Sequence, residues 1–328
     1  MRVATAAGFI SVALWASAFV GIRAAGPHFA PGPLAVGRLL IGSVVLGLIV
    51  AVRREPLPAR RDIPAIVLCG LLWFALYNVA LNAGERHVDA GTASMIVRVG
   101  PVLTAIGAGL FLGEGFSRNV FAGGAIAIAG AGVIAAATRA GGAVALGGVL
   151  LCLLAATAYA GGVVTEKVVL RRVSPLQTVF LCCVVGALAC SPFLPEFARE
   201  AGSAPGGSLA WLIYLGVFPT AIGFTTWAYA LSRSEAAKLG TLAYLAPPIS
   251  IVLAWLALGE TPPLLALAGG ATSLIGVAVS RGGRPRLLTV RRDDPQAREV
   301  RAVARGVTRQ QIEPADRGMR ADVEVGER

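Results

Sequence analysis

Residues 101–114 read PVLTAIGAGLFLGE and residues 247–260 read PPISIVLAWLALGE, so a proline and a Leu-Gly-Glu ending recur 146 residues apart. The alignment continues without a gap, because AGGA at residues 122–125 meets AGGA at residues 268–271. Alanine and leucine match easily in an apolar chain, whereas glycine, proline and glutamate seldom match by chance. The sequence therefore predicts an internal repeat, with two copies of one structural unit.

The composition is that of a protein whose main solvent is lipid. Of the 328 residues, 56% are hydrophobic and 14% are charged, and the mean hydropathy is +0.73. Soluble domains have roughly 45–50% apolar and about 25% charged residues. All five cysteines lie inside apolar stretches and are expected to be buried, neither paired nor metal-bound. We expect an all-α integral membrane protein, because a helix satisfies its own backbone hydrogen bonds in lipid. We expect no metal and no cofactor.

Ten apolar stretches are each long enough to cross a bilayer, which takes about 20 residues in a helix. They recur at short intervals, contain almost no charge and lack the alternation of barrel strands. The predicted spans are residues 5–25, 33–52, 63–82, 90–112, 118–138, 146–167, 174–194, 208–230, 236–258 and 262–281.

The number of spans in each copy sets how the copies are related. A shift of 144 residues aligns the first span with the sixth and pairs Trp15 with Tyr159. The same shift pairs Arg23 with Lys167. Each copy then holds five spans, and because five is odd the second copy must enter the membrane from the opposite face. Such inverted repeats are how many secondary transporters build two exchangeable states around one central site.

Loop charges predict which ends face the cytoplasm. If the N-terminus is inside, the cytoplasmic connections carry most of the basic residues, and the opposite loops carry few. This positive-inside bias places both termini in the cytoplasm and explains the net charge of +11 without a nucleic-acid partner. The basic residues of the cytoplasmic connections are Arg53, Arg54, Arg60, Arg61, Arg118, Lys167, Arg171, Arg172, Arg233 and Lys238.

Three units follow from the repeat and the charges. Residues 1–139 and 140–281 are expected to be the two five-helix units, and residues 282–328 a disordered basic cytoplasmic tail. The start of the tail can touch anionic lipid headgroups, although a merely solvated tail is an equal alternative. The arginines placed for this contact are Arg284, Arg286, Arg291 and Arg292.

The repeated motifs resemble a known family. A proline followed by Leu-Gly-Glu in the fourth and ninth spans, with WASAFVGIR at residues 15–23, is similar to the EamA group of the drug/metabolite transporter superfamily. The resemblance covers residues 5–281 and omits the tail. It implies a ten-helix inner-membrane carrier, commonly an exporter of amino acids, metabolites or small drugs. It says little about the substrate.

Polar residues inside the spans are candidates for the site, because they are expensive in hydrocarbon. Arg98 lies deep in the fourth span with Ser94 one turn before it, and it either meets a substrate carboxylate or pairs with a helix terminus. Its counterpart in the repeat is Tyr244, so the site would be asymmetric. Arg38 in the second span is expected to snorkel to the interface or to anchor the helix.

Two other spans present polar and aromatic side chains together. Asn78 and Asn82 share one face of the third span, and Thr226 and Trp227 mark the eighth. These faces could bind a polar solute or form hydrogen bonds between helices. The predicted cavity lining is completed by Trp15, Ser17 and Tyr159.

Acids and prolines occupy equivalent places in the two copies. Glu114 and Glu260 end the fourth and ninth spans, where a carboxylate opposes the helix dipole, so we expect the N-terminus of the following helix to hold each one. Their role is structural, with proton coupling as the alternative. Pro101, Pro247 and Pro248 are expected to kink the spans, as hinges or as packing devices.

These features predict a secondary transporter that moves a small organic solute, by export in the resembling family. No Gly-x4-Gly-Lys-Ser/Thr sequence occurs, so the chain is not itself an ATP-driven pump. The alternatives are a membrane-embedded lipid-modifying enzyme and a non-transport assembly subunit. An enzyme would need paired acids or a histidine–acid set, and the sequence displays neither within the spans. The expected partners are the solute and the lipid bilayer, with a homodimer left open.

Overall fold

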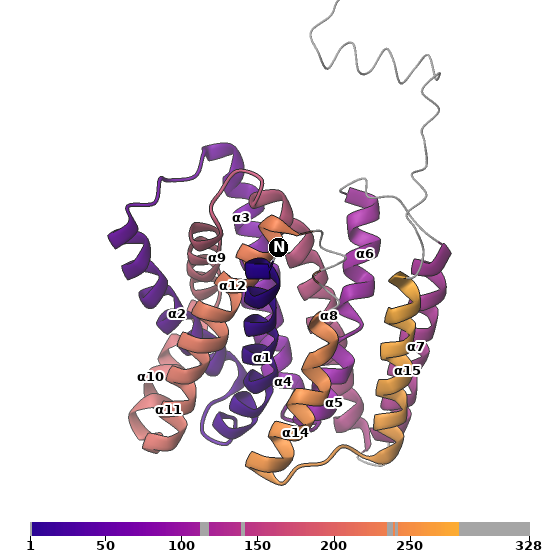
Figure 1. Ribbon diagram of the computed structural model, residues 1–328. Helices are drawn as coiled ribbons and strands as arrows, with labels where there is room; N and C mark the ends of the chain where they lie inside the picture. The colour runs from indigo at the N-terminus through magenta and orange to yellow at the C-terminus, as the bar shows by residue number, and fades with distance from the viewer. Residues whose placement is uncertain (1, 112–117, 139–141, 235–238, 240–241, 282–328) are drawn as a thin grey trace, which may run out of the picture. The chain divides into compact units, whose positions relative to one another are not determined.

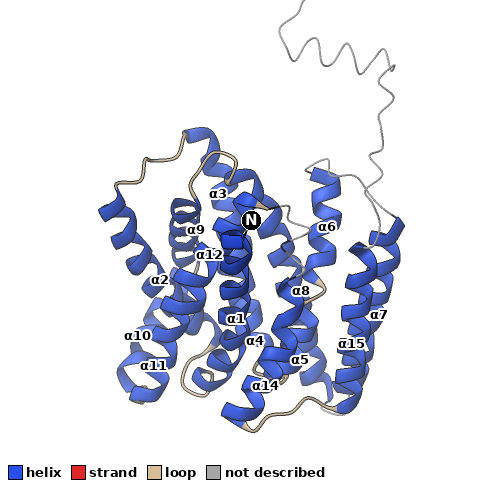
Figure 2. Cartoon of the chain, viewed as in Figure 1, coloured by secondary structure: helices blue, strands red, loops and turns tan. Residues whose placement is uncertain are grey.

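The computed structural model describes residues 2–111, 118–138, 142–234, 239 and 242–281, and every regular element in these ranges is helical (Figures 1 and 2). The predicted tail, residues 282–328, and Glu114 lie outside the described residues. The α-helices are α1 Arg2–Ala25, α2 Pro31–Arg53, α3 Ile63–Cys69, α4 Tyr77–Gly84, α5 Ala90–Val97, α6 Gly100–Phe111, α7 Arg118–Thr138, α8 Gly142–Val169, α9 Pro175–Ala189, α10 Leu194–Ser203, α11 Gly206–Leu215, α12 Phe224–Arg233, α14 Ala246–Leu258 and α15 Leu264–Arg281.

The described helices confirm a protein that crosses the membrane many times. Six are long and apolar enough to span it, and a seventh forms if α9 and the following Ser191–Ser203 segment, bent by 55°, count as one span. Three shorter apolar helices lie at Ala122–Ile134, Ala246–Leu258 and Leu264–Gly276. The break falls at Cys190, two residues before Pro192, whose ring nitrogen cannot donate the hydrogen bond that a continuous helix needs.

The three prolines that were predicted to kink continuous spans lie instead in the first turns of helices. In the fourth span α5 ends at Val97 and α6 begins at Gly100, so Pro101 is the second residue of α6. In the ninth, Pro247 and Pro248 stand in the first turn of α14, after a short 3-10 segment at Leu242–Leu245. Proline is tolerated in a first turn, because the amides there have no partner within the helix. Both spans are thus interrupted just before the equivalent proline.

The third and eighth spans also share an irregularity. A π-helical segment lies at Gly70–Leu76 and another at Gly216–Gly223, 146 residues further along. Their first glycines make equivalent contacts, since Gly70 packs against Val185 and Gly216 against Ile41. The wider turn of a π-helix leaves carbonyl groups without regular partners, and such segments are frequent at functional sites.

The second and seventh spans run in opposite directions. Gly32, near the start of α2, lies against Phe193, just after α9 ends. Gly47, near the end of α2, lies against Phe180, near the start of α9. The glycines allow this close approach, because a side chain on either would meet the phenylalanine ring.

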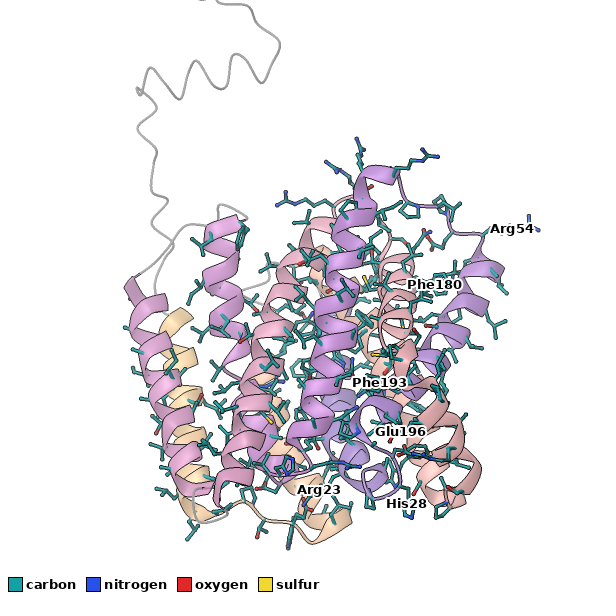
Figure 3. The ribbon with its side chains drawn as sticks, turned by 180° about the vertical axis from the view of Figure 1, so that it is seen from behind. Arg23, His28, Arg54, Phe180, Phe193 and Glu196 are labelled. Atoms are coloured by element: carbon teal, nitrogen blue, oxygen red, sulfur yellow. The ribbon has the colours of Figure 1, made fainter. Side chains whose placement is uncertain are left out.

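The fifth and tenth spans, α7 and α15, lie side by side in both views of the bundle (Figures 1 and 3). They are antiparallel, because Gly130 approaches Ser273 whereas Gly276 approaches Ala127. A Cβ on Gly130 would fall inside the contact distance of the Ser273 nitrogen and the Gly269 carbonyl oxygen, which are backbone atoms that cannot rotate away. The two helices therefore pack backbone against backbone, as small residues permit in lipid.

We predict that Gly130→Ala destabilises the protein by about 1–3 kcal/mol, because the added methyl group forces α7 and α15 apart. Gly132→Ala on the same helix is the matched control, since its Cβ would meet nothing within 4 Å. It should be neutral or stabilising by up to about 1 kcal/mol. Thermal unfolding of both variants in detergent measures the difference, and equal melting temperatures would contradict the packing.

Candidate functional site

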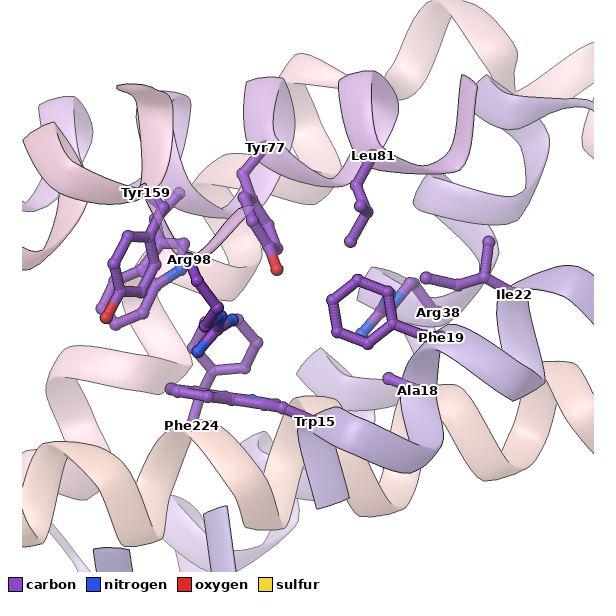
Figure 4. Close-up of a pocket in the computed structure, with 11 residues that line it drawn as sticks. Trp15, Ala18, Phe19, Ile22, Arg38, Tyr77, Leu81, Arg98, Tyr159 and Phe224 are labelled. Atoms are coloured by element: carbon purple, nitrogen blue, oxygen red, sulfur yellow. The ribbon is translucent and has the colours of Figure 1, made fainter. Parts of the chain in front are cut away.

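An internal cavity lies where the interrupted and π-helical spans meet (Figure 4). Its volume is about 20 Å³, which is room for roughly one water molecule. The walls come from α1, α2, the third span, the end of α5, α8 and the start of α12. The lining residues are Trp15, Ala18, Phe19, Ile22, Arg38, Trp73, Tyr77, Leu81, Arg98, Tyr159 and Phe224.

Arg98 caps α5 at the interruption of the fourth span, and its side chain points into the cavity (Figure 4). It is only 3% exposed. One terminal nitrogen donates to the Ala243 carbonyl at 3.0 Å, in the 3-10 segment of the ninth span. Its Nε has no hydrogen-bond partner among the described residues. The two interrupted spans therefore meet at a guanidinium that keeps unused donor capacity.

Arg38 reaches the same cavity from the middle of α2. It is 3% exposed, so the expected snorkelling is wrong. Its Nε donates to Thr220 Oγ1 at 3.1 Å, and the Thr220 hydroxyl donates to the Leu215 carbonyl at 2.7 Å. Thr220 lies in the π-helical segment of the eighth span, where the irregular turn presents its hydroxyl to Arg38. Arg38 therefore anchors α2, as the alternative predicted, but its side chain faces the cavity and not the membrane interface.

Aromatic rings form most of the remaining wall. Trp15 packs edge-on against Phe224 at 5.2 Å between centroids and against Trp73 at 6.0 Å. Trp73 in turn meets Tyr159 at 5.3 Å. The indole nitrogen of Trp15 donates to the Pro219 carbonyl at 3.2 Å, which fixes the ring in place. The rings give the cavity a rigid apolar surface beside the two arginines.

The predicted residues divide into two groups. Trp15, Arg98 and Tyr159 line the cavity, as expected. Trp227 lies behind Trp15 at 4.9 Å and does not reach the cavity. The Tyr244 side chain is outside the described residues.

The other predicted polar residues form hydrogen bonds within the protein. Asn78 donates to the Phe74 carbonyl at 2.7 Å within its own span, and Asn82 donates to the Pro31 carbonyl of α2 at 3.0 Å. Ser94 and Thr226 bond to hydroxyls of other helices, Ser250 and Ser11 respectively. Ser17 does the same with the hydroxyl of Tyr214. Asn82, Ser94, Thr226 and Ser17 thus bond to neighbouring helices, whereas Asn78 bonds within its own span.

Helical spacing could have found the lining residues that were missed. Residues 15, 18, 19 and 22 form one face of α1, and Trp73, Tyr77 and Leu81 repeat every four residues in the third span. Phe224 and Arg38 carry no such signal, because each comes singly from its helix.

One end of the bundle is held by Arg23, which Figure 3 shows beside the loops at that end. Its Nε forms an ion pair with Glu260 Oε1 at 2.7 Å, and its terminal nitrogen donates to the Glu85 carbonyl at 2.7 Å. Glu260 is therefore held by Arg23, and not by the N-terminus of α15 as the sequence suggested. We call this set, Arg23, Glu85 and Glu260, the Arg23 cluster.

The opposite end is held by Lys167, at the end of α8. Its ammonium donates to the Leu231 carbonyl at 2.7 Å and to the Ser234 carbonyl at 2.8 Å, where α12 ends. α8 runs antiparallel to the third span, since Gly84 packs on Cys152 and Gly162 on Trp73. Lys167 consequently lies near the start of that span, whereas Arg23 contacts its end. We call Lys167 and its two carbonyls the Lys167 cluster.

A bundle of spanning helices that directs buried charges into a cavity beside interrupted helices is the architecture of a secondary transporter. The comparison with known families agrees. The EamA-like transporter family matches residues 3–136 and again residues 146–282, and this chain belongs to that family. The protein is a membrane transporter, as the sequence motifs predicted.

Named relatives are similar over most of their length. A probable terminal-alkyne amino-acid exporter of Streptantibioticus cattleyicolor is 38% identical over 269 residues, which is 82% of this chain and 90% of that protein. A probable amino-acid metabolite efflux pump of Salmonella typhimurium is 28% identical over 292 residues, 83% and 94% of the two chains. A solved crystal structure with 23% identity and a TM-score of 0.61, covering 84% of this chain and 96% of that one, supports the fold alone.

The Glu85 carboxyl predicts a pH dependence of stability. It is 1% exposed, and neither oxygen has a hydrogen-bond partner among the described residues. Burial raises the pKa of Glu85 well above its ordinary value of 4.5, and Arg23 offsets only part of this effect. A carboxyl whose pKa rises on folding favours the folded state while protonated. Its contribution is complete below pH 4.5 and is lost as the pH rises through the folded pKa.

We therefore expect the melting temperature of the wild type in detergent to fall relative to Glu85→Gln as the pH is raised from 4.5. The gap should reach several degrees, because about 1 kcal/mol shifts the melting temperature of a large domain by about 2–4 °C. Glu196→Gln, at an exposed carboxyl, should leave the wild-type pH profile unchanged. Parallel curves for wild type and Glu85→Gln would contradict the prediction.

Proposed function

We propose that this protein exports a small organic solute across the cytoplasmic membrane by alternating access, with two inverted five-helix halves around the cavity. The halves are residues 1–139 and 140–281, with ten spans in total and both termini in the cytoplasm. Export and an amino-acid-related solute are supported by the relatives, which are named as an amino-acid exporter and an amino-acid metabolite efflux pump.

The observation that carries the proposal is that the same contact closes both ends. Arg23 donates to the carbonyl of Glu85, and Lys167 donates to the carbonyl of Leu231. The two cations are 144 residues apart and their acceptors 146 apart, the same offsets that align the repeats. Since the clusters lie at opposite ends of the bundle, a copy inserted upside down accounts for the pair.

Antiparallel packing of equivalent spans supports the same relation. The second and seventh spans and the fifth and tenth run in opposite directions, as described above. The fourth and ninth do so as well, because Gly91 packs against Ile251 whereas Arg98 reaches Ala243. Three shorter apolar helices added to the seven spans give ten.

Alternating access then follows from the two clusters. By the positive-inside bias the Arg23 cluster faces outward and the Lys167 cluster faces the cytoplasm. With both clusters formed the cavity holds about 20 Å³, so an organic solute enters only when one of them opens. Loss of the cytoplasmic contacts admits the solute, and subsequent loss of the Arg23–Glu260 pair releases it outside.

The test uses a cysteine in the cavity wall, Ala18→Cys, and a membrane-impermeant maleimide applied from either face of oriented vesicles. We predict labelling from both faces. Adding Arg23→Ala should raise labelling from the outside severalfold and lower it from the cytoplasm, because a partly exposed ion pair contributes up to about 1 kcal/mol. Solute flux into proteoliposomes, with and without a proton gradient, is measured in parallel.

Val44→Cys is the control. Val44 lies on the face of α2 that points away from the bundle, so the cysteine should be covered by lipid and stay unlabelled. The five native cysteines are all buried, so they give little background. Labelling of Ala18→Cys from one face only, in every background and with flux intact, would overturn alternating access.

A further inference from the structure

We infer that the cavity, enlarged when one end of the bundle opens, binds an organic monocarboxylate with an apolar body, its carboxylate held between Arg38 and Arg98, and that a substrate ammonium group is not required. This inference rests on the proposed transport function and names the substrate class of the same cavity. The inference depends on the charge of the cavity wall, on the hydrogen-bond donor of Arg98 that has no partner, and on the apolar character of the rest of the lining.

The charge of the wall is positive, and Glu85, the carboxyl that attracts Arg38, lies outside the lining. Arg38 and Arg98 are both buried and both directed at the same space (Figure 4). The described residues that line the cavity include no aspartate or glutamate. Within the described ranges the ion pairs are Arg23–Glu260, Arg172–Asp62 and Arg199–Glu196, and none of them includes either cavity arginine.

Buried charges without counter-ions are costly, and the protein offsets this cost only in part. Each guanidinium has a neutral acceptor, the Ala243 carbonyl for Arg98 and Thr220 Oγ1 for Arg38. The Nε of Arg98 is buried without a partner. A carboxylate between the two side chains would supply both the missing charge and the missing acceptors, and such charge-assisted bonds are among the strongest in proteins.

The rest of the wall selects the body of the solute. Trp15, Trp73 and Phe224 present apolar ring surface, and Figure 4 shows the Tyr77 hydroxyl turned into the same space between Arg98 and Arg38. A positive group on the solute would find two guanidiniums and no carboxylate. Amines should therefore be rejected, and a zwitterion should bind less tightly than the same molecule without its amino group.

Three molecules with one phenyl body separate these possibilities. They are 3-phenylpropionate, phenylalanine and phenethylamine, which carry the carboxylate alone, both groups and the amine alone. Binding to the purified full-length protein in detergent is followed by thermal shift and by quenching of tryptophan fluorescence, since two tryptophans line the cavity. We expect 3-phenylpropionate to bind most tightly, by about tenfold or more over phenethylamine.

Variants assign the preference to the two arginines. Arg98→Gln and Arg38→Gln should each weaken 3-phenylpropionate about tenfold or more and leave phenethylamine no weaker. Arg98→Lys keeps the charge and should retain part of the affinity, which guards against a variant that fails to fold. Arg199→Gln, which removes an exposed charge outside the cavity, is the matched control and should bind as the wild type does.

The outcomes distinguish this inference from the proposed function. Preference for phenethylamine, no preference at all, or wild-type carboxylate binding in folded Arg38→Gln and Arg98→Gln overturns the inference. If other solutes move through proteoliposomes while carboxylates neither bind nor move, transport stands and the substrate class is wrong. If 3-phenylpropionate binds as expected and no solute moves, the site stands and the transport mechanism is wrong.

Discussion

The hydrogen bond from Arg98 to the Ala243 carbonyl joins the interruptions of the fourth and ninth spans. In hydrocarbon an unpaired backbone group costs several kcal/mol, so a helix can be interrupted only where protein or a cavity supplies the partner. Arg98 supplies one from the end of α5 to the 3-10 segment before α14. Arg98 lines the cavity at the point where these two spans meet.

The same requirement explains the two ends of the bundle. Arg23 and Lys167 each place a cation on carbonyls at the C-terminal end of a span, where the helix dipole is negative and the last carbonyls lack partners. Each contact is electrostatic and polar. At the Arg23 end, Glu260 adds a carboxylate to the closure.

The sequence predicted the helical class and the repeat well, because apolar length and glycine or proline matches survive without any knowledge of packing. It predicted the cavity only in part. Trp15, Tyr159 and Arg98 were found because large or charged groups inside a span are conspicuous, but Arg38 was judged by its depth alone. Asn78 and Asn82 looked equally suitable, yet the amide nitrogen of each donates to a nearby carbonyl and neither residue lines the cavity. Which face of a helix meets which neighbour depends on crossing geometry, and spacing along one chain does not contain it.

The lining of the cavity is asymmetric, although equivalent helices of the two predicted copies surround it. A two-fold related pair of halves would place equal groups on both sides of the centre, and the contacts of Gly70 and Gly216 keep that relation. At the centre it is lost, since Arg98 corresponds to Tyr244 and Trp15 to Tyr159. A solute on the axis has only one orientation in which its charged end meets the arginines. In the proposed mechanism the backbone can therefore exchange its two conformations while the bound solute keeps one orientation. The proposed selectivity and the proposed conformational exchange thus depend on different features of the sequence.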